Sequence, residues 1–230
     1  MNKTTLDKSS SVTPTTCSPS LKIAILDTGC NSHDFFADKN IEYIEDDNGH
    51  GTQLNGIVSS IAPFSHIINF KVADKNGQSN EKYVIDAIKK SIQLKVDIIL
   101  LAMGGKEDNK ELHKVIKEAY KNKIIIVCAS GNSREYEHYP AMYKECISVG
   151  ALLPNGGIAP WSQYADLYTI GYNVATTTLN NDWYKATGTS MAAAIITGYV
   201  AQLFYEKGPM TNIKVRKELL KKEDVINGYI

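Results

Sequence analysis

The sequence predicts an α/β fold with a mainly parallel sheet, and two observations lead to this prediction. Apolar runs of strand length alternate along the chain with stretches in which apolar residues recur at helical spacing. Such alternation is typical of parallel sheets joined by right-handed helical crossovers. In addition, the run 123–130 has almost no polar interruption, which indicates a strand buried on both faces. We therefore expect helices on both faces of the sheet.

The individual elements follow from the same pattern, taken in chain order. Strands are expected at 21–26, 41–45, 66–72, 96–103 and 123–130. Helices are expected from about His50, where Leu54, Ile57 and Val58 share one face, and then at 81–95, 107–122 and 211–222. No internal repeat or second linker is visible. We expect one domain over 21–230, preceded by a flexible, Ser/Thr-rich lead-in over 1–20.

Composition and charge exclude several classes of partner. Of the 230 residues, 43% are apolar and 22% charged, which is ordinary for a globular protein. Basic and acidic residues balance at 25 each, so neither nucleic acid nor an anionic membrane is expected as a partner. No apolar run is long enough to span a bilayer, and the lead-in lacks the apolar stretch of a secretory signal. We expect a cytoplasmic location.

The cysteines show no metal-binding spacing. Cys17, Cys30, Cys128 and Cys146 form no CxxC pair, and in the cytoplasm we expect reduced thiols. Cys128 lies in an apolar run and reads as a core residue. The role of Cys30 is open between a packed small side chain and a thiol that reacts with mercurials.

Polar or glycine-containing motifs follow three of the expected strands. Asp27-Thr28-Gly29 follows the first, Gly104-Gly105 follows the fourth, and Ser130-Gly131-Asn132 ends the fifth. In open parallel sheets, ligands bind outside the carboxyl ends of the strands. We therefore expect the functional site at this edge.

Four residues in this order could carry chemistry, although each has a plainer interpretation. Ser190, between Gly188-Thr189 and an apolar helix, could project a hydroxyl at a helix N-terminus or simply cap the helix. His50, flanked by glycines, could be a base or an exposed turn residue. Asp27 could orient an imidazolium or form a turn, and Asn132 could stabilise an oxyanion or belong to an ordinary Gly-Asn turn.

Read together, these motifs resemble the subtilisin-like serine proteases. The chain order Asp, His, Ser is the subtilisin order. IAILDTG resembles the aspartate motif of that family, NGHGT its histidine motif, ASGN its oxyanion-hole motif and GTSMAAA its serine motif. The resemblance runs from about Leu21 to about Leu203. It implies a subtilisin-like three-layer fold, with Asp27, His50 and Ser190 as the triad and Asn132 in the oxyanion hole.

The resemblance also implies where a substrate lies and which metal is absent. An extended peptide is expected along Leu101–Gly105, with Leu101, Ala102 and Gly104 on one wall of the primary specificity pocket and Ala129 and Gly131 on the other. Ala102 stands where the family commonly has Ser, and Gln53 where a second His often follows. Segment 59–66 is too short for the family's calcium loop, so we expect no cofactor and no tight calcium site there. The family's inhibitory propeptide is also not seen.

Two classes of function remain open. The first is a monomeric serine endopeptidase that acts on peptides or proteins. It could be a dedicated processor of a peptide precursor, such as a leader peptidase, or a general degrading enzyme. The second is a catalytically silent protein of the same fold that only binds peptides. Retention of all four chemical groups favours the first class.

Overall fold

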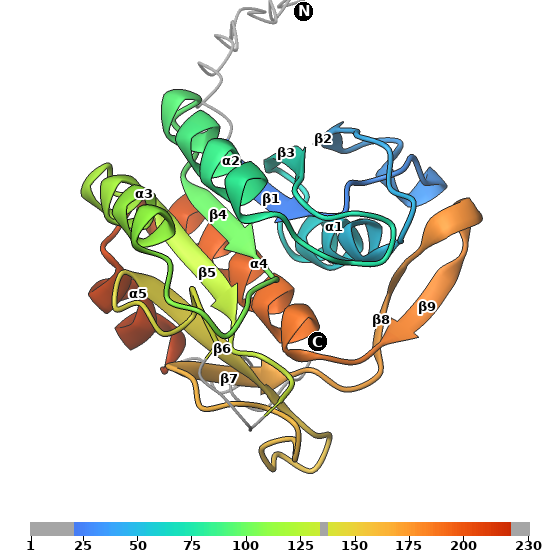
Figure 1. The fold of residues 1–230 in the computed structure, drawn as a ribbon. Coiled ribbons are helices and arrows are strands. Elements are labelled where there is room, and N and C mark those ends of the chain that lie inside the picture. Colours follow the sequence, from blue (N-terminus) through green and yellow to red (C-terminus); the bar gives the residue numbers. More distant parts are fainter. Residues whose placement is uncertain (1–20, 134–137, 222–230) are drawn as a thin grey trace, which may run out of the picture.

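A computed structural model describes residues 21–133 and 138–221 and contains the predicted parallel sheet (Figure 1). The sheet has seven strands in the order β2-β3-β1-β4-β5-β6-β7, and every neighbouring pair is parallel. Its strands are β1 (Lys22–Asp27), β2 (Asn40–Glu42), β3 (His66–Lys71), β4 (Ile98–Leu101), β5 (Ile125–Ala129), β6 (Cys146–Leu152) and β7 (Leu167–Ile170). The lead-in expected over 1–20 lies outside the described residues.

Helices cover both faces of this sheet, as predicted. One face packs against α1 (His50–Ile61) and α4 (Thr189–Lys207), and the other against α2 (Glu81–Gln93) and α3 (Lys110–Lys121). Alternate residues of each central strand enter the two cores: Leu100 faces the side of α1 and α4, whereas Leu101 faces the side of α2 and α3. The continuous apolar runs of the sequence are thus explained by burial on both faces.

The structure extends the predicted elements between residues 138 and 219. Strands β6 and β7 complete the sheet, and β8 (Val174–Thr177) pairs with β9 (Trp183–Ala186) as an antiparallel hairpin. The strand expected over 41–45 is shorter, and Ile44 instead forms an isolated bridge with Cys30. The final helix, α5 (Asn212–Leu219), is not purely a surface element, because Val215 and Leu219 are fully buried.

The β8–β9 hairpin lies against α1, away from the main sheet (Figure 1). Two threonine hydroxyls of β8 make this contact. Thr176 donates to the carbonyl of Gln53 at 2.6 Å, and Thr177 donates to that of Thr52 at 2.8 Å. The hairpin thereby supports the first turn of α1, which carries His50.

Among the described residues, no helix is long and apolar enough to cross a membrane.

Helices α1 and α4 cross at a point where only glycine fits. A Cβ atom added at Gly198 would lie 2.7 Å from Cβ of Ile61. Because Ile61 is itself part of the core, the two helices would have to move apart. We expect Gly198→Ala to lower the free energy of unfolding by about 1–3 kcal/mol, measured by urea denaturation.

Gly105→Ala is the matched control for this change, because a Cβ there meets no atom within 4 Å. Equal stability of the two variants would contradict the close crossing.

Candidate active site

Asp27 and His50 meet at the carboxyl edge of the sheet. Asp27 is the last residue of β1 and His50 is the first of α1. Their side chains are joined by a 2.7 Å contact between Oδ1 of Asp27 and Nδ1 of His50. The carboxylate is buried, whereas the imidazole is 27% exposed. Since a carboxylate can only accept, Nδ1 carries the proton, and Nε2 of the neutral ring is left as the basic nitrogen.

Asp27 is held from one side only. Its Oδ1 atom also accepts from the backbone N–H of Thr28 at 2.8 Å, whereas Oδ2 is buried without a partner among the described residues. Thr28 in turn accepts from the backbone N–H of Gly51 at 2.9 Å, which ties the end of β1 to the first turn of α1.

A glycine next to His50 allows the backbone at the start of α1 to lie against the loop that follows β1. A Cβ at Gly51 would collide with the carbonyl oxygen of Gly29, so the loop after β1 packs directly on the start of α1. Gly49 has a φ of 97°, a conformation that glycine adopts at little cost. Gly51 thus has the close-approach role that the sequence suggested for both glycines, whereas a Cβ at Gly49 would meet only side-chain atoms of Leu179 and Thr178, at 3.2 Å or more.

A second buried carboxylate, Asp46, lies behind His50. One of its oxygens accepts from the backbone N–H groups of Asn48 and Gly49, and the other from the backbone N–H and the hydroxyl of Thr52. Asp46 thus satisfies free N–H groups at the start of α1, where Gly49 offers no capping side chain. Sequence reasoning missed it, because Glu45, Asp46 and Asp47 are consecutive and nothing in the sequence tells which one is buried.

The balance of burial and charge sets the pKa of His50. Burial favours the neutral ring and lowers the pKa, but the charge of Asp27 and its hydrogen bond raise it, and the charge of Asp46 adds to this effect. The net result is a pKa above the ordinary value of 6.5. As the pH falls, the His50 ring therefore takes up its second proton, and ceases to be a base, at a higher pH than a free histidine does.

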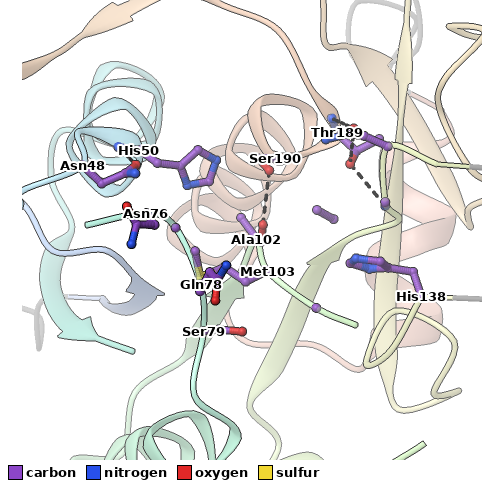
Figure 2. A pocket seen from close by; sticks show the side chains of 15 residues that line it. Asn48, His50, Asn76, Gln78, Ser79, Ala102, Met103, His138, Thr189 and Ser190 are labelled. Carbon is purple, nitrogen blue, oxygen red and sulfur yellow. Dashed lines mark hydrogen bonds between the residues drawn. The ribbon is translucent and has the colours of Figure 1, made fainter. Parts of the chain in front are cut away.

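Ser190 lies in the first turn of α4, as the sequence predicted. The helix begins at Thr189 after Gly188, so Ser190 is at its positively polarised N-terminus. The side chain is mostly buried, and its hydroxyl donates to the carbonyl of Ala102 at 3.2 Å. Figure 2 shows the His50 ring turned toward Ser190 within the same cleft.

Thr189 fixes the orientation of Asn132. Oδ1 of Asn132 accepts from the backbone N–H of Thr189 at 2.9 Å and from its hydroxyl at 3.0 Å. Because the carbonyl end of the amide is thus occupied, the Nδ2 donor remains available next to Ser190. The Thr189 hydroxyl also accepts from the N–H of Gly131 at 3.2 Å. Thr189 is a second positioning residue that the sequence did not single out.

His50, Asn132 and Ser190 line one cleft of about 490 Å³. Of the predicted residues, His50, Ser190, Asn132, Ala102, Gly104, Ala129 and Gly131 line it. Asp27 does not line the cleft but contacts the far side of the His50 ring. Leu101 does not line it either, because its side chain is buried in the core between the sheet and helices α2 and α3. Met103, which lies within the expected substrate segment, also lines the cleft. The lining residues that sequence reasoning missed are Asn48, Asn76, Gly77, Gln78, Ser79, His138 and Thr189 (Figure 2).

Comparison with known proteins places the chain in a family. The model of the subtilase family matches residues 18–226, which is most of the chain. The chain belongs to the subtilase family. The major intracellular serine protease of Bacillus subtilis is 33% identical over 214 residues, covering 79% of this chain and 67% of that protein. The intracellular serine protease of Paenibacillus polymyxa is 31% identical over 213 residues, covering 79% and 65%.

Other relatives of this subtilase differ more in length. The minor extracellular protease Epr of Bacillus subtilis is 30% identical over 222 residues, and the match covers 87% of this chain but only 34% of that protein. The chain thus spans between about a third and two thirds of these three relatives. A cold-adapted subtilisin-like serine proteinase of known crystal structure has the same fold, with a TM-score of 0.80 at 21% identity over 88% of this chain and 81% of that one.

Cys30 lies in the core of this subtilase, close to the Asp27–His50 pair. It is fully buried, and burial together with the charge of Asp46 raises the pKa of its thiol far above the ordinary value. The thiolate, which is the form that reacts, is therefore disfavoured. This placement agrees with the packed small side chain and not with a mercurial-sensitive thiol.

The connection between α1 and β3, where the sequence suggested that no calcium loop fits, is short in this subtilase. Helix α1 ends at Ile61 and β3 begins at His66, so only residues 62–65 join them. This segment, Ala-Pro-Phe-Ser, has no carboxylate. Within residues 21–133 and 138–221, no group of three or more His, Cys, Asp or Glu side chains could hold a metal ion. The absence of a tight calcium site at this connection stays a prediction.

Proposed function

We propose that this subtilase is a serine endopeptidase that cleaves peptide bonds through an acyl-enzyme. The observation that carries the proposal is the 2.7 Å contact between Asp27 and His50, together with the His50 ring turned toward Ser190 in the cleft that both residues line (Figure 2). A hydroxyl, a base and an orienting carboxylate in this order are the parts of a nucleophilic triad.

In the proposed reaction, the Ser190 hydroxyl turns from the carbonyl of Ala102 toward Nε2 of His50. His50 takes the proton as Oγ attacks the substrate carbonyl, and then gives it to the leaving amine. Asp27 keeps Nδ1 protonated and stabilises the imidazolium that forms. Water then attacks the acyl-enzyme by the same proton transfers in reverse order, which frees Ser190.

The negative charge that develops on the substrate oxygen has two proposed donors. One is Nδ2 of Asn132, whose orientation Thr189 supports by occupying Oδ1. The other is the backbone N–H of Ser190 at the start of α4, where the helix dipole also favours negative charge.

We expect Asn132→Asp to lower kcat about 100- to 1000-fold with little change in KM, the range known for an oxyanion-hole asparagine in a subtilisin. The variant keeps an oxygen to accept from Thr189 but replaces the side-chain donor by a carboxylate, whose charge also repels the developing oxyanion. Peptide hydrolysis measured beside an Asn122→Ala control, which changes a surface residue, tests this. An unchanged kcat would remove Asn132 from the proposed oxyanion hole.

The proposed substrate is a peptide or protein bound as an extended strand along Leu101–Gly105. Within this activity we keep precursor processing, as by a leader peptidase, as the narrower proposal and general degradation as its rival. We further propose a monomeric, cytoplasmic, calcium-independent enzyme. Two relatives named as intracellular proteases support the location, although a third is named extracellular.

The experiment is digestion of an unfolded protein such as reduced casein, with mapping of the new termini by mass spectrometry. New termini that appear with EDTA present, and that vanish after treatment with a fluorophosphonate, are expected. A few defined termini favour processing and many favour degradation. If a folded chain produces none and also takes up no fluorophosphonate, the silent peptide-binding alternative replaces the proposal; uptake of the probe without new termini favours a precursor-specific enzyme.

A further inference from the structure

The imidazole of His138 lies between two glycines that face each other in the cleft. A Cβ at Gly104 would lie 2.5 Å from Cε1 and 2.8 Å from Nδ1 of this ring. A Cβ at Gly131 would lie 2.9 Å from Cγ and 3.0 Å from Cδ2. One edge of the ring therefore packs on the α-carbon of Gly104 and the opposite edge on that of Gly131. The ring spans the gap between the two backbones.

This gap is the space between the ends of two neighbouring strands. Gly104 follows β4 and Gly131 follows β5, and the two strands are paired in parallel up to Leu101 and Cys128. The same backbones lie beside Ser190, because its hydroxyl donates to the carbonyl of Ala102 and Asn132 adjoins Gly131. A substrate side chain next to the bond under attack would enter between these walls.

The ring is held in the gap from two directions. Behind it, Tyr139 and Gly105 exchange two backbone hydrogen bonds of 2.8 and 2.9 Å, which tie the residue after His138 to the residue after Gly104. The ring itself hydrogen-bonds with the backbone of Ala129. Burial lowers the pKa of His138 below 6.5 despite this bond, so the ring is neutral at pH 7. Figure 2 shows the side chain at the end of the cleft away from His50.

We propose that His138 fills the primary specificity pocket, so that the enzyme cleaves after small residues such as Gly, Ala and Ser. This inference rests on the proposed peptidase function and narrows its substrate. A ring in contact with both walls leaves no room between them for an aromatic or long aliphatic side chain. None of the described residues that line the cleft is Asp, Glu, Lys or Arg. The cleft therefore offers no charged group that would select a substrate with a charged side chain.

The test compares peptides that are identical except for Ala, Leu or Phe on the acyl side of the scissile bond. We expect the wild-type chain to cleave after Ala at least about 10-fold more efficiently than after Phe, in kcat/KM. In His138→Gly the pocket is open, so the Phe-to-Ala ratio of kcat/KM is expected to rise about 10-fold or more. His66→Ala, a change at the distant start of β3, is the matched control.

The outcomes separate this inference from the proposed function. Active sites are counted with a fluorophosphonate in each variant, so that misfolded protein does not enter the rates. A wild-type chain that reacts with the probe but cleaves after Phe as well as after Ala overturns the inference alone, even if His138→Gly does not fold. An unchanged Phe-to-Ala ratio in folded His138→Gly overturns it too. A wild-type chain that neither reacts nor cleaves overturns the proposed function together with the inference.

Discussion

Ser190→Ala is expected to lower the turnover of a peptide substrate about a million-fold, the loss known for the triad serine of a subtilisin. The hydroxyl is the nucleophile of the proposed reaction, and the neighbouring hydroxyl of Thr189 is not expected to replace it, because it is engaged with Asn132 and Gly131. The rate that remains is expected to come from the oxyanion donors and substrate binding. Hydrolysis of a fluorogenic peptide by highly purified protein measures the effect.

The control for this change is Ser60→Ala. Ser60 lies on α1 and its hydroxyl donates to the carbonyl of Ile57 within the same helix, so near-normal turnover is expected. Turnover in Ser190→Ala within about 10-fold of the wild-type value would exclude the acyl-enzyme mechanism.

Asp27→Asn is expected to lower kcat roughly 10⁴-fold, the scale known for the triad aspartate of other serine proteases. An asparagine can donate to Nδ1 of His50, which favours the wrong tautomer and leaves the basic nitrogen facing away from Ser190.

The residual activity of Asp27→Asn should also have a different pH profile. In the wild-type chain the pKa of His50 is raised, so activity is expected to fall as pH decreases through a value above 6.5.

Without the charge of Asp27, burial dominates and the pKa of His50 falls, since only the weaker effect of Asp46 opposes it. The acid side of the profile should therefore move to lower pH, which kcat/KM measured from about pH 5 to 9 detects. Asp38→Asn, at an exposed surface position, is the control. An acid side that stays in place would mean that His50 is not the titrating base.

The sequence predicted the first half of the fold well, for an identifiable reason. Strands β1 and β5 and helices α2 and α3 lie where apolar periodicity placed them to within a few residues, because these elements are buried on one regular face or on both. The strands after residue 145 were not predicted. β7, β8 and β9 have four residues each, and most of the residues of β9 are exposed, so their apolar pattern is weak. This reason does not cover β6, whose seven residues are all buried.

The candidate site shows the same division. Asp27, His50, Asn132 and Ser190 belong to local motifs at strand ends and helix starts, so the sequence could bring them together. His138 could not be found in this way, because its position depends on backbone hydrogen bonds between Tyr139 and Gly105, which are far apart in the sequence. Leu101, expected on a wall of the specificity pocket, lies in the core on the α2 and α3 side of the sheet and lines a hollow next to the cleft together with Met103 and Gly104. Its part in substrate binding stays a prediction.

The central claim is that Ser190 is an activated nucleophile, and labelling with a fluorophosphonate probe tests it most directly. The wild-type chain, with EDTA present, is treated with the probe, digested and mapped by mass spectrometry beside Ser190→Ala. We predict one label per chain, on Ser190, that EDTA does not diminish and that the alanine variant lacks. A folded wild-type chain that takes up no label, or takes it up at another residue, would contradict the account.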